Sequence, residues 1–351
     1  MPTLKSVMRR SLKHAAITGG LELSSLAGRA GLMTSARGRG AIFTLHHVRP
    51  KTFHDFDPNA HLEITPEFLD ETIRLLESEG YQFVALHHMA ARMAIARPEE
   101  RFAAFTLDDG YRNNAVHAQP IFTEHRVPFT VFVTGGFCCR THSIWWETLT
   151  ELLRTLPHVE FDFGSGIVTL PLATTWQKDA AFARFAAFIQ AGDEMTAVAA
   201  LDRLAKQHGI DPLLITERLI MREPELKSLV LNPLATLGAH TISHRALSRL
   251  EDNEAREEMQ ASAERIQCLT GVRPVAFAYP YGFSPTVTAR EHRLAAEAGF
   301  DLAVTTVPGT LDARSFDQPM ALPRISVNGL YQKRKYVSAL ASGIPFRLMR
   351  R

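Results

Sequence analysis

The chain has 351 residues, of which 46% are hydrophobic, 22% are charged and 9% are aromatic. This balance excludes a disordered protein, a collagen-like chain and a coiled coil, and it allows one large domain with insertions or two smaller domains. No stretch of about 18 residues is both apolar and free of charge, so the sequence predicts no membrane-spanning helix. Three cysteines cannot form a disulfide framework, so the chain does not need an oxidising compartment.

The net charge of +2 is unevenly distributed along the chain. Residues 1–40 and residues 331–351 each carry a net charge of +6, so residues 41–330 carry −10. An acidic body with basic ends is not the footprint of a nucleic-acid-binding domain, and we expect no nucleic-acid partner. Basic ends most often keep a protein in solution, but they also suit an anionic membrane surface. Both interpretations stay open.

Apolar residues recur at helical spacing near the N-terminus, with basic residues between them. Leu4, Val7, Met8 and Leu12 predict a basic amphipathic helix, which either lies on a membrane surface or docks on the domain. The apolar stretch that follows is short and interrupted by glycines, so no cleavable signal peptide is recognised. The sequence predicts a cytoplasmic protein, free in solution or peripheral at the inner membrane.

From residue 41 onward, short apolar runs alternate with helical stretches. The runs predicted as strands are 41–48, 82–86, 102–109, 128–134, 235–240, 275–280, 301–306 and 322–327. The stretches predicted as helices are 66–79, 113–125, 252–269 and 286–298, and the first of them begins at Pro66 after the capping residue Thr65. This alternation predicts an α/β fold, a distorted or incomplete (β/α) barrel of about seven to eight mostly parallel strands.

One segment, residues 145–230, breaks the alternation. It contains a hairpin-like piece followed by two or three helices, so we expect a mainly helical insertion that forms a subdomain or lid over one end of the barrel. The chain then divides into a basic amphipathic segment (1–40), a barrel domain with this insertion (41–330) and a basic C-terminal tail (331–351).

Two adjacent carboxylates, Asp108 and Asp109, stand at the end of a predicted strand. Such a pair is electrostatically costly unless a cation lies beside it. Because adjacent side chains point in different directions, one carboxylate can bind a metal ion while the other acts as a base. The alternative is a pair that caps the helix that follows.

Two histidines, His240 and His244, follow another predicted strand. At this spacing they share one face if the segment is helical, and they can then converge on one ion. Two imidazoles and one carboxylate are a common catalytic zinc set. A third strand is followed by the run Pro280-Tyr281-Gly282, a rigid turn that either presents a backbone N–H to an oxyanion or only forms a corner of the barrel.

The runs FTLDDGY, HTISH and FAYPYG, in this order, resemble the polysaccharide deacetylases of carbohydrate esterase family 4, the NodB-homology domain. The resemblance covers about residues 41–330 and implies a distorted (β/α) barrel and removal of an acetyl group from an N-acetylated sugar. It implies a divalent metal, usually zinc, with cobalt, nickel or manganese as other choices. Asp109, His240 and His244 would be the metal ligands, Asp108 the general base, and the Tyr281 N–H the support for the oxyanion.

The chain departs from the family pattern at two positions. Many members carry an arginine that orients the base where this chain has Ala278, so Arg324 or Arg273 is a candidate replacement. The C-terminal histidine that usually acts as the general acid is absent. The run TLHHV resembles the start of a circularly permuted branch in which an N-terminal histidine takes that role. This makes His46 the candidate acid and His47 the less favoured one, unless both only pack or cap.

Aromatic residues near these motifs suit contact with a sugar ring. Tyr111, Trp145, Trp146 and Tyr279 are candidates for substrate binding, although packing of the insertion explains the tryptophans equally well. The sequence therefore predicts a metal-dependent deacetylase of an N-acetylglucosamine-containing polysaccharide or oligosaccharide, which releases acetate. Two alternatives remain, a metal-free cyclic-amide hydrolase similar to allantoinase and a non-catalytic glycan-binding module.

Overall fold

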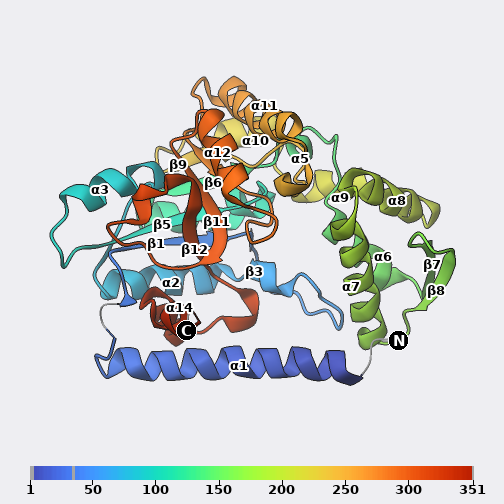
Figure 1. Ribbon diagram of the computed structural model, residues 1–351, viewed down its shortest axis with the longest axis horizontal. Coiled ribbons are helices and arrows are strands. Elements are labelled where there is room, and N and C mark those ends of the chain that lie inside the picture. Colours follow the sequence, from blue (N-terminus) through green and yellow to red (C-terminus); the bar gives the residue numbers. More distant parts are fainter. Residues whose placement is uncertain (1–3, 34–35, 350–351) are drawn as a thin grey trace.

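The computed structural model describes residues 4–33 and 36–349, without the side chains of residues 4–14 and 29 (Figure 1). Its main sheet contains eight parallel strands, β1 (Gly40–Leu45), β4 (Tyr81–Phe83), β5 (Arg101–Leu107), β6 (Phe129–Val133), β9 (Ala235–Ala239), β10 (Ala276–Ala278), β11 (Leu302–Pro308) and β12 (Leu322–Ser326). Seven of them close into a barrel in the order β1–β12–β11–β10–β9–β6–β5, because β5 pairs again with β1, and β4 lies beside β5. The predicted (β/α) barrel is confirmed.

The barrel strands are buried on both faces, as parallel strands with helices outside them must be. β1 and β6 are buried along their whole length. Ile42 and Phe132 belong to a buried cluster inside the barrel, whereas Phe43 and Phe105 belong to the cluster between the strands and the outer helices. This alternation explains why the strands read as continuous apolar runs in the sequence.

Helices cover the outside of the barrel (Figure 1). They are α2 (Pro66–Ser78), α3 (Met89–Ile95), α4 (Gln119–Glu124), α5 (Gly135–Cys138), α11 (Asp252–Thr270) and α12 (Ala289–Glu297). The predicted start of α2 is confirmed, since the Thr65 hydroxyl accepts a hydrogen bond from the Phe68 N–H at 3.1 Å. The helix predicted over 113–125 is divided, because a π-helical turn (Asn114–Ala118) precedes α4.

The segment between β6 and β9 forms a body beside the barrel (Figure 1). It contains α6 (Trp145–Thr155), the antiparallel hairpin β7 (His158–Asp162) and β8 (Ile167–Pro171), and then α7 (Thr175–Ala191), α8 (Glu194–Gln207) and α9 (Pro212–Leu219). Helix α10 (Glu223–Leu229) follows them and packs against α11 on the barrel. Four helices therefore follow the hairpin, not two or three. Helix α9 begins where the Asp211 side chain caps it and Pro212 occupies its first position.

Both terminal segments fold onto the barrel domain. Helix α1 (Leu4–Arg29) lies along one side of the molecule and contacts α13 (Arg334–Ala341) and α14 (Ile344–Met349) (Figure 1). The expected basic tail is thus helical where it is described, because Tyr336, Ile344 and Phe346 are buried. The predicted amphipathic pattern at residues 4–12 lies outside the described side chains. Among the described helices, none is both long and apolar enough to cross a membrane.

Candidate active site

The three predicted metal ligands meet at the carboxyl ends of β5 and β9. The Asp109 Oδ1 atom lies 3.5 Å from His240 Nε2 and 3.3 Å from His244 Nε2. The three residues are buried, and each offers a ligand atom within 4.8 Å of the others. Two imidazoles and one carboxylate in this arrangement form the donor set of catalytic zinc sites.

The hydrogen bonds around these residues suit a divalent cation. Asp109 Oδ1 is buried without a hydrogen-bond partner among the described residues. His240 Nδ1 lies 2.7 Å from the Ala278 carbonyl, which assigns the proton to Nδ1 and leaves Nε2 free to bind a metal. Burial raises the pKa of Asp109, but the two histidines lower it more, so this carboxyl group stays ionised. The residues therefore fit a metal ion.

The segment HTISH is a loop, so the histidines do not meet on a helix face, which the i, i+4 spacing would give if the segment were helical. Thr241 and His244 adopt left-handed backbone conformations, with φ of 62° and 59°. The Glu258 carboxylate on α11 accepts hydrogen bonds from the N–H groups of Ile242 at 2.8 Å and Ser243 at 2.9 Å. Strained conformations of this kind persist only where surrounding contacts hold them. The two imidazoles converge because the loop is held in this shape.

Asp108 and Arg324 form a buried ion pair beside this cluster. Arg324 Nη1 and Nη2 donate to the two Asp108 oxygens at 2.8 and 2.7 Å. Burial raises the pKa of Asp108, but the adjacent guanidinium lowers it more, so the group is ionised. The other candidate, Arg273, precedes β10 at the opposite edge of the barrel and donates to the Ala298 carbonyl. Of the two arginines, only Arg324 contacts the carboxylate of Asp108.

His46 lies at the same edge, at the end of β1. Its Nε2 atom is 4.0 Å from Asp108 Oδ2, and its side chain is 22% exposed. Burial lowers the pKa of His46 to about 4, although the carboxylates of Asp108 and Asp109 oppose this shift. The imidazole is therefore neutral near pH 7.

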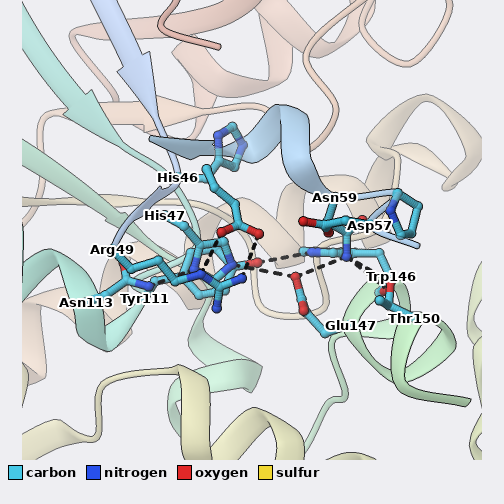
Figure 2. A network of polar contacts seen from close by, with 12 residues as sticks. His46, His47, Arg49, Asp57, Asn59, Tyr111, Asn113, Trp146, Glu147 and Thr150 are labelled. Carbon is cyan, nitrogen blue, oxygen red and sulfur yellow. Dashed lines mark hydrogen bonds and ion pairs between the residues drawn. The ribbon is translucent and has the colours of Figure 1, made fainter. Parts of the chain in front are cut away.

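His47 belongs to a different network, which links the barrel to the insertion. Its ring is fully buried against Tyr111, with 3.6 Å between the ring centres. Asn113 lies 2.7 Å from its Nδ1 atom, and the Glu147 carboxylate lies 3.5 Å from its Nε2 atom. Figure 2 shows the neighbouring His46 and His47 rings turned away from each other. Within the described structure, only His46 of this pair lies within 4.0 Å of a carboxylate of the Asp108–Asp109 pair.

The turn at Tyr281 has a fixed orientation. Tyr281 adopts a φ of 60°, and the Gly282 N–H donates to the Pro280 carbonyl at 2.6 Å. Because a peptide group is planar, this bond also fixes the direction of the Tyr281 N–H. The Thr306 hydroxyl donates to the Tyr281 carbonyl at 2.6 Å and holds the other side of the residue.

Glu194, a residue that the sequence did not single out, connects this turn to the histidine loop. One oxygen accepts a hydrogen bond from the Tyr281 hydroxyl, and the other accepts one from the Ala246 N–H at 3.0 Å. Trp145 Nε1 donates to the same Tyr281 hydroxyl at 3.1 Å. Glu194 belongs to α8 of the insertion, and a single glutamate at a helix start gives no signal for such a contact.

Three of the predicted aromatic residues surround the cluster, and the fourth does not. Trp145 and Trp146 line a pocket of about 260 Å³ together with His244. Trp146 Nε1 donates to the hydroxyl of the fully buried Tyr111 at 3.1 Å. Tyr279 is 1% exposed and donates to the carbonyl of a 3₁₀ turn outside the barrel, so its ring has no free face for a sugar.

Comparisons with known proteins identify the family of the chain. The family model described as polysaccharide deacetylase matches residues 96–180 and 189–303, more than half of the chain. A comparison with curated proteins gave no match.

Several solved structures share the fold at low sequence identity. The deacetylase PplD of Streptococcus pyogenes, in complex with acetate, is 17% identical over 82% of this chain and 92% of that chain, with a TM-score of 0.52. IcaB from Ammonifex degensii is 15% identical over 88% and 97%, with a TM-score of 0.53. The deacetylase domain of BpsB from Bordetella bronchiseptica is 15% identical over 82% and 95%, with a TM-score of 0.50. The chain belongs to the polysaccharide deacetylase family, hydrolases that act on the amide bonds of acetylated polysaccharides.

Proposed function

We propose that this protein is a metal-dependent N-deacetylase of an N-acetylglucosamine-containing polysaccharide or oligosaccharide. The observation that carries the proposal is a buried Asp109 oxygen that has no hydrogen-bond partner among the described residues. It faces His240 and His244 beside the Asp108–Arg324 ion pair. The ionised Asp108, the three side chains that can bind a metal ion and the fixed turn at Tyr281 lie at one edge of the barrel. Amide hydrolysis requires a base, a group that activates water and a group that stabilises the oxyanion.

The proposed metal ligands are Asp109, His240 and His244. A divalent cation there, zinc or alternatively cobalt, nickel or manganese, would polarise the acetyl carbonyl and lower the pKa of a water molecule. Asp108 would take the proton from that water, since Arg324 keeps its carboxyl group ionised. The Tyr281 N–H would stabilise the negative charge that develops on the carbonyl oxygen.

The leaving nitrogen needs a proton, and His46 is the proposed donor. Its neutral imidazole lies 4.0 Å from Asp108 Oδ2, so it can receive the proton that Asp108 has taken from water. Transfer of that proton to the nitrogen, as the carbon–nitrogen bond breaks, gives acetate and a free amine. In this scheme His46 is a general acid that becomes charged only during the reaction.

The sugar is proposed to bind in the pocket beside His244. Trp145 and Trp146 line that pocket, and aromatic rings suit the apolar faces of sugars. The candidate acceptors are an exopolysaccharide, a lipid-linked precursor and a chitooligosaccharide.

The test is acetate release from N-acetylglucosamine oligomers by the wild type and by an Asp109→Ala/His244→Ala variant. We expect release by the wild type alone, and loss of release when a chelator removes the metal. Hydrolysis that survives chelation would favour the metal-free amide hydrolase. Glycan binding by the metal-loaded protein without any acetate release would favour the binding module.

A cytoplasmic location, free or peripheral at the inner membrane, is also a proposal. It rests on the net charge of +6 in each terminal segment and on the sequence pattern at the N-terminus. Sedimentation with anionic vesicles at low salt tests the peripheral form, and a protein that stays in the supernatant would contradict it.

A further inference from the structure

An apolar cavity that the proposed reaction does not use lies between the terminal helices and the barrel. Its volume is about 520 Å³, within the range of about 300–1,000 Å³ that small-molecule sites occupy. Helix α1 contributes Ile17, Gly20 and Leu21 to its walls, and α13 and α14 contribute Val337 and Phe346. Apart from Arg324 and a few hydroxyl and amide groups, the walls are aliphatic or aromatic.

The cavity borders the catalytic groups. Pro308 and Ser326, which line it, end β11 and β12 at the carboxyl edge of the barrel, where the metal cluster also lies. The pairing of these two strands is irregular between Val304 and Pro308. Thr306 and Arg324 also line the cavity. The Thr306 hydroxyl donates to the Tyr281 carbonyl, and Arg324 pairs with the Asp108 carboxylate. The cavity and the catalytic site thus share a wall.

The lining selects a hydrocarbon rather than a second saccharide. A sugar carries a hydroxyl group on most of its carbons, and each buried hydroxyl needs a hydrogen-bond partner. The aliphatic and aromatic side chains of the cavity offer few such partners. A hydrocarbon chain loses nothing by leaving water for such walls and gains from the apolar area it buries.

Two positively charged side chains, Lys333 and Arg347, lie next to residues that line the cavity, and we call them its basic rim. Lys333 Nζ is 5.3 Å from the centre of the Tyr336 ring, which lines the cavity. Arg347 is exposed between the lining residues Phe346 and Leu348. In the described part of the chain, neither cation is within ion-pair distance of a carboxylate. A phosphate group next to the hydrocarbon would complement them.

We propose that this cavity binds the hydrocarbon chain of the substrate, an N-acetylated saccharide joined through phosphate to a lipid. The proposal rests on the proposed deacetylase function and specifies its substrate class. The sugar lies at the metal cluster, the chain lies in the cavity across the shared wall, and the phosphate lies near the basic rim.

Two adjacent glycines of α1 give a matched pair of variants. A Cβ atom added at Gly20, or at Gly19, would meet no atom within 4 Å, so neither backbone position resists a side chain. Gly20 lines the cavity, whereas Gly19 is exposed and does not. Gly20→Phe therefore fills the cavity, and Gly19→Phe is its control. Ala16→Phe, at another lining position, serves as a second filling variant if Gly20→Phe does not fold.

The experiment compares two substrates with the same sugar, a soluble N-acetylglucosamine oligomer and N-acetylglucosamine linked through phosphate to a long alkyl chain. We expect the wild type to have a KM at least about tenfold lower for the alkyl-linked sugar, since each buried methylene contributes a severalfold gain in affinity. Gly20→Phe should abolish this preference and leave kcat/KM for the soluble oligomer unchanged. Gly19→Phe should behave as the wild type does.

Equal KM values for the two substrates in the wild type would overturn the proposal, as would an alkyl preference that both filling variants keep. Reduced binding of anionic phospholipid vesicles by Gly20→Phe, without any change in the substrate preference, would instead make the cavity a site for membrane lipid and would also overturn it. Binding of a fluorescent alkyl phosphate is measured separately, so its loss in Gly20→Phe tests the cavity even if no acetate is released. Failure of the deacetylase function is thereby distinguished from failure of the cavity proposal.

Discussion

Both carboxylate oxygens of Asp108 are bound by the single guanidinium of Arg324, at 2.8 and 2.7 Å. The two residues come from strands far apart in the sequence, β5 and β12, which lie on either side of β1 in the barrel. The Arg324 side chain is fully buried, and that of Asp108 is 3% exposed. A carboxylate this deeply buried stays ionised only because the guanidinium compensates its charge, and an ionised carboxylate is what a general base requires.

Replacing Arg324 by Met should therefore affect both stability and activity. The uncompensated charge of Asp108 should lower the free energy of unfolding by about 3–5 kcal/mol. Loss of the ionised base should lower kcat/KM by about 10²–10⁴-fold. Arg324→Lys should recover part of the stability and part of kcat/KM, because lysine restores the positive charge without the paired hydrogen bonds.

The control for this change is Arg273→Met, at the other edge of the barrel. It removes one hydrogen bond to the Ala298 carbonyl and should leave kcat unchanged. Thermal unfolding and acetate release measure the two effects. Wild-type activity in a folded Arg324→Met variant would contradict the role assigned to the ion pair.

Replacing His46 by Gln should lower kcat by about 10²–10⁴-fold, because the leaving nitrogen then lacks a proton donor. The neutral state of His46 in the resting protein adds a distinctive expectation for the wild type. The kcat of the wild type should not fall as the pH rises from 6 to 8, because the His46 imidazole is already neutral throughout this pH range. A descending limb near pH 6.5 that disappears in His46→Gln would show that the acid must be charged beforehand.

The lowered pKa of His46 also predicts how stability depends on pH. The folded protein binds this proton only near pH 4, whereas the unfolded chain binds it below about pH 6.5. Between these two pH values the unfolded chain binds more protons at His46 than the folded protein does, so the free energy of unfolding rises with pH. Above about pH 6.5 His46 is neutral in both states and no longer lowers the stability. His46→Gln removes this dependence. As the pH falls from 7.5 to 5, the free energy of unfolding of the variant should therefore rise by about 2 kcal/mol relative to that of the wild type. Parallel stability curves for the two proteins would contradict the shift.

The sequence predicts most of the barrel because its signals are local. Apolar runs bounded by turn residues mark the strands, and the Thr65–Pro66 pair marks the start of α2. The proximity of Asp109 and the two histidines also follows from the sequence, since the carboxyl ends of parallel strands share one edge of a barrel. The shape of the histidine loop does not follow, because contacts from Glu258 on a distant helix determine it.

Other features depend on tertiary contacts that no local pattern encodes. Glu194 reaches Tyr281 only because the insertion folds over the barrel edge. Tyr279 is different, since a usable signal was present. It follows Ala278, which lies in the cluster inside the barrel, so strand alternation places the tyrosine outside. The helical C-terminal segment also had a signal, with Tyr336, Val337, Leu340 and Ile344 at helical spacing.

Metal content tests the three proposed ligands directly. The purified protein should hold about one equivalent of divalent metal, and the Asp109→Ala/His244→Ala variant should hold none. Because ligand histidines must be neutral, metal should dissociate as the pH falls. The control His125→Ala removes a histidine that is bonded to Asp70 outside the site, and it should keep the metal. Full acetate release by metal-free protein would contradict the assignment.

Glu194→Gln tests whether the insertion positions the turn at Tyr281. Both carboxylate oxygens accept a hydrogen bond, from the Tyr281 hydroxyl and from the Ala246 N–H, and a glutamine offers only one acceptor. One donor is left unsatisfied, at a cost of about 1–3 kcal/mol. If the turn shifts, kcat should fall about tenfold or more while the metal content is unchanged.

The same exchange at Glu151, a partly exposed residue of the insertion that pairs with Arg218, should leave kcat unchanged. Combination with Tyr281→Phe separates a positioning role from a general loss of stability. If Glu194 acts through the tyrosine hydroxyl, the double variant should be no slower than the slower single variant, because the two changes break the same contact. Fully additive losses in kcat would mean that Glu194 acts on the reaction by another route.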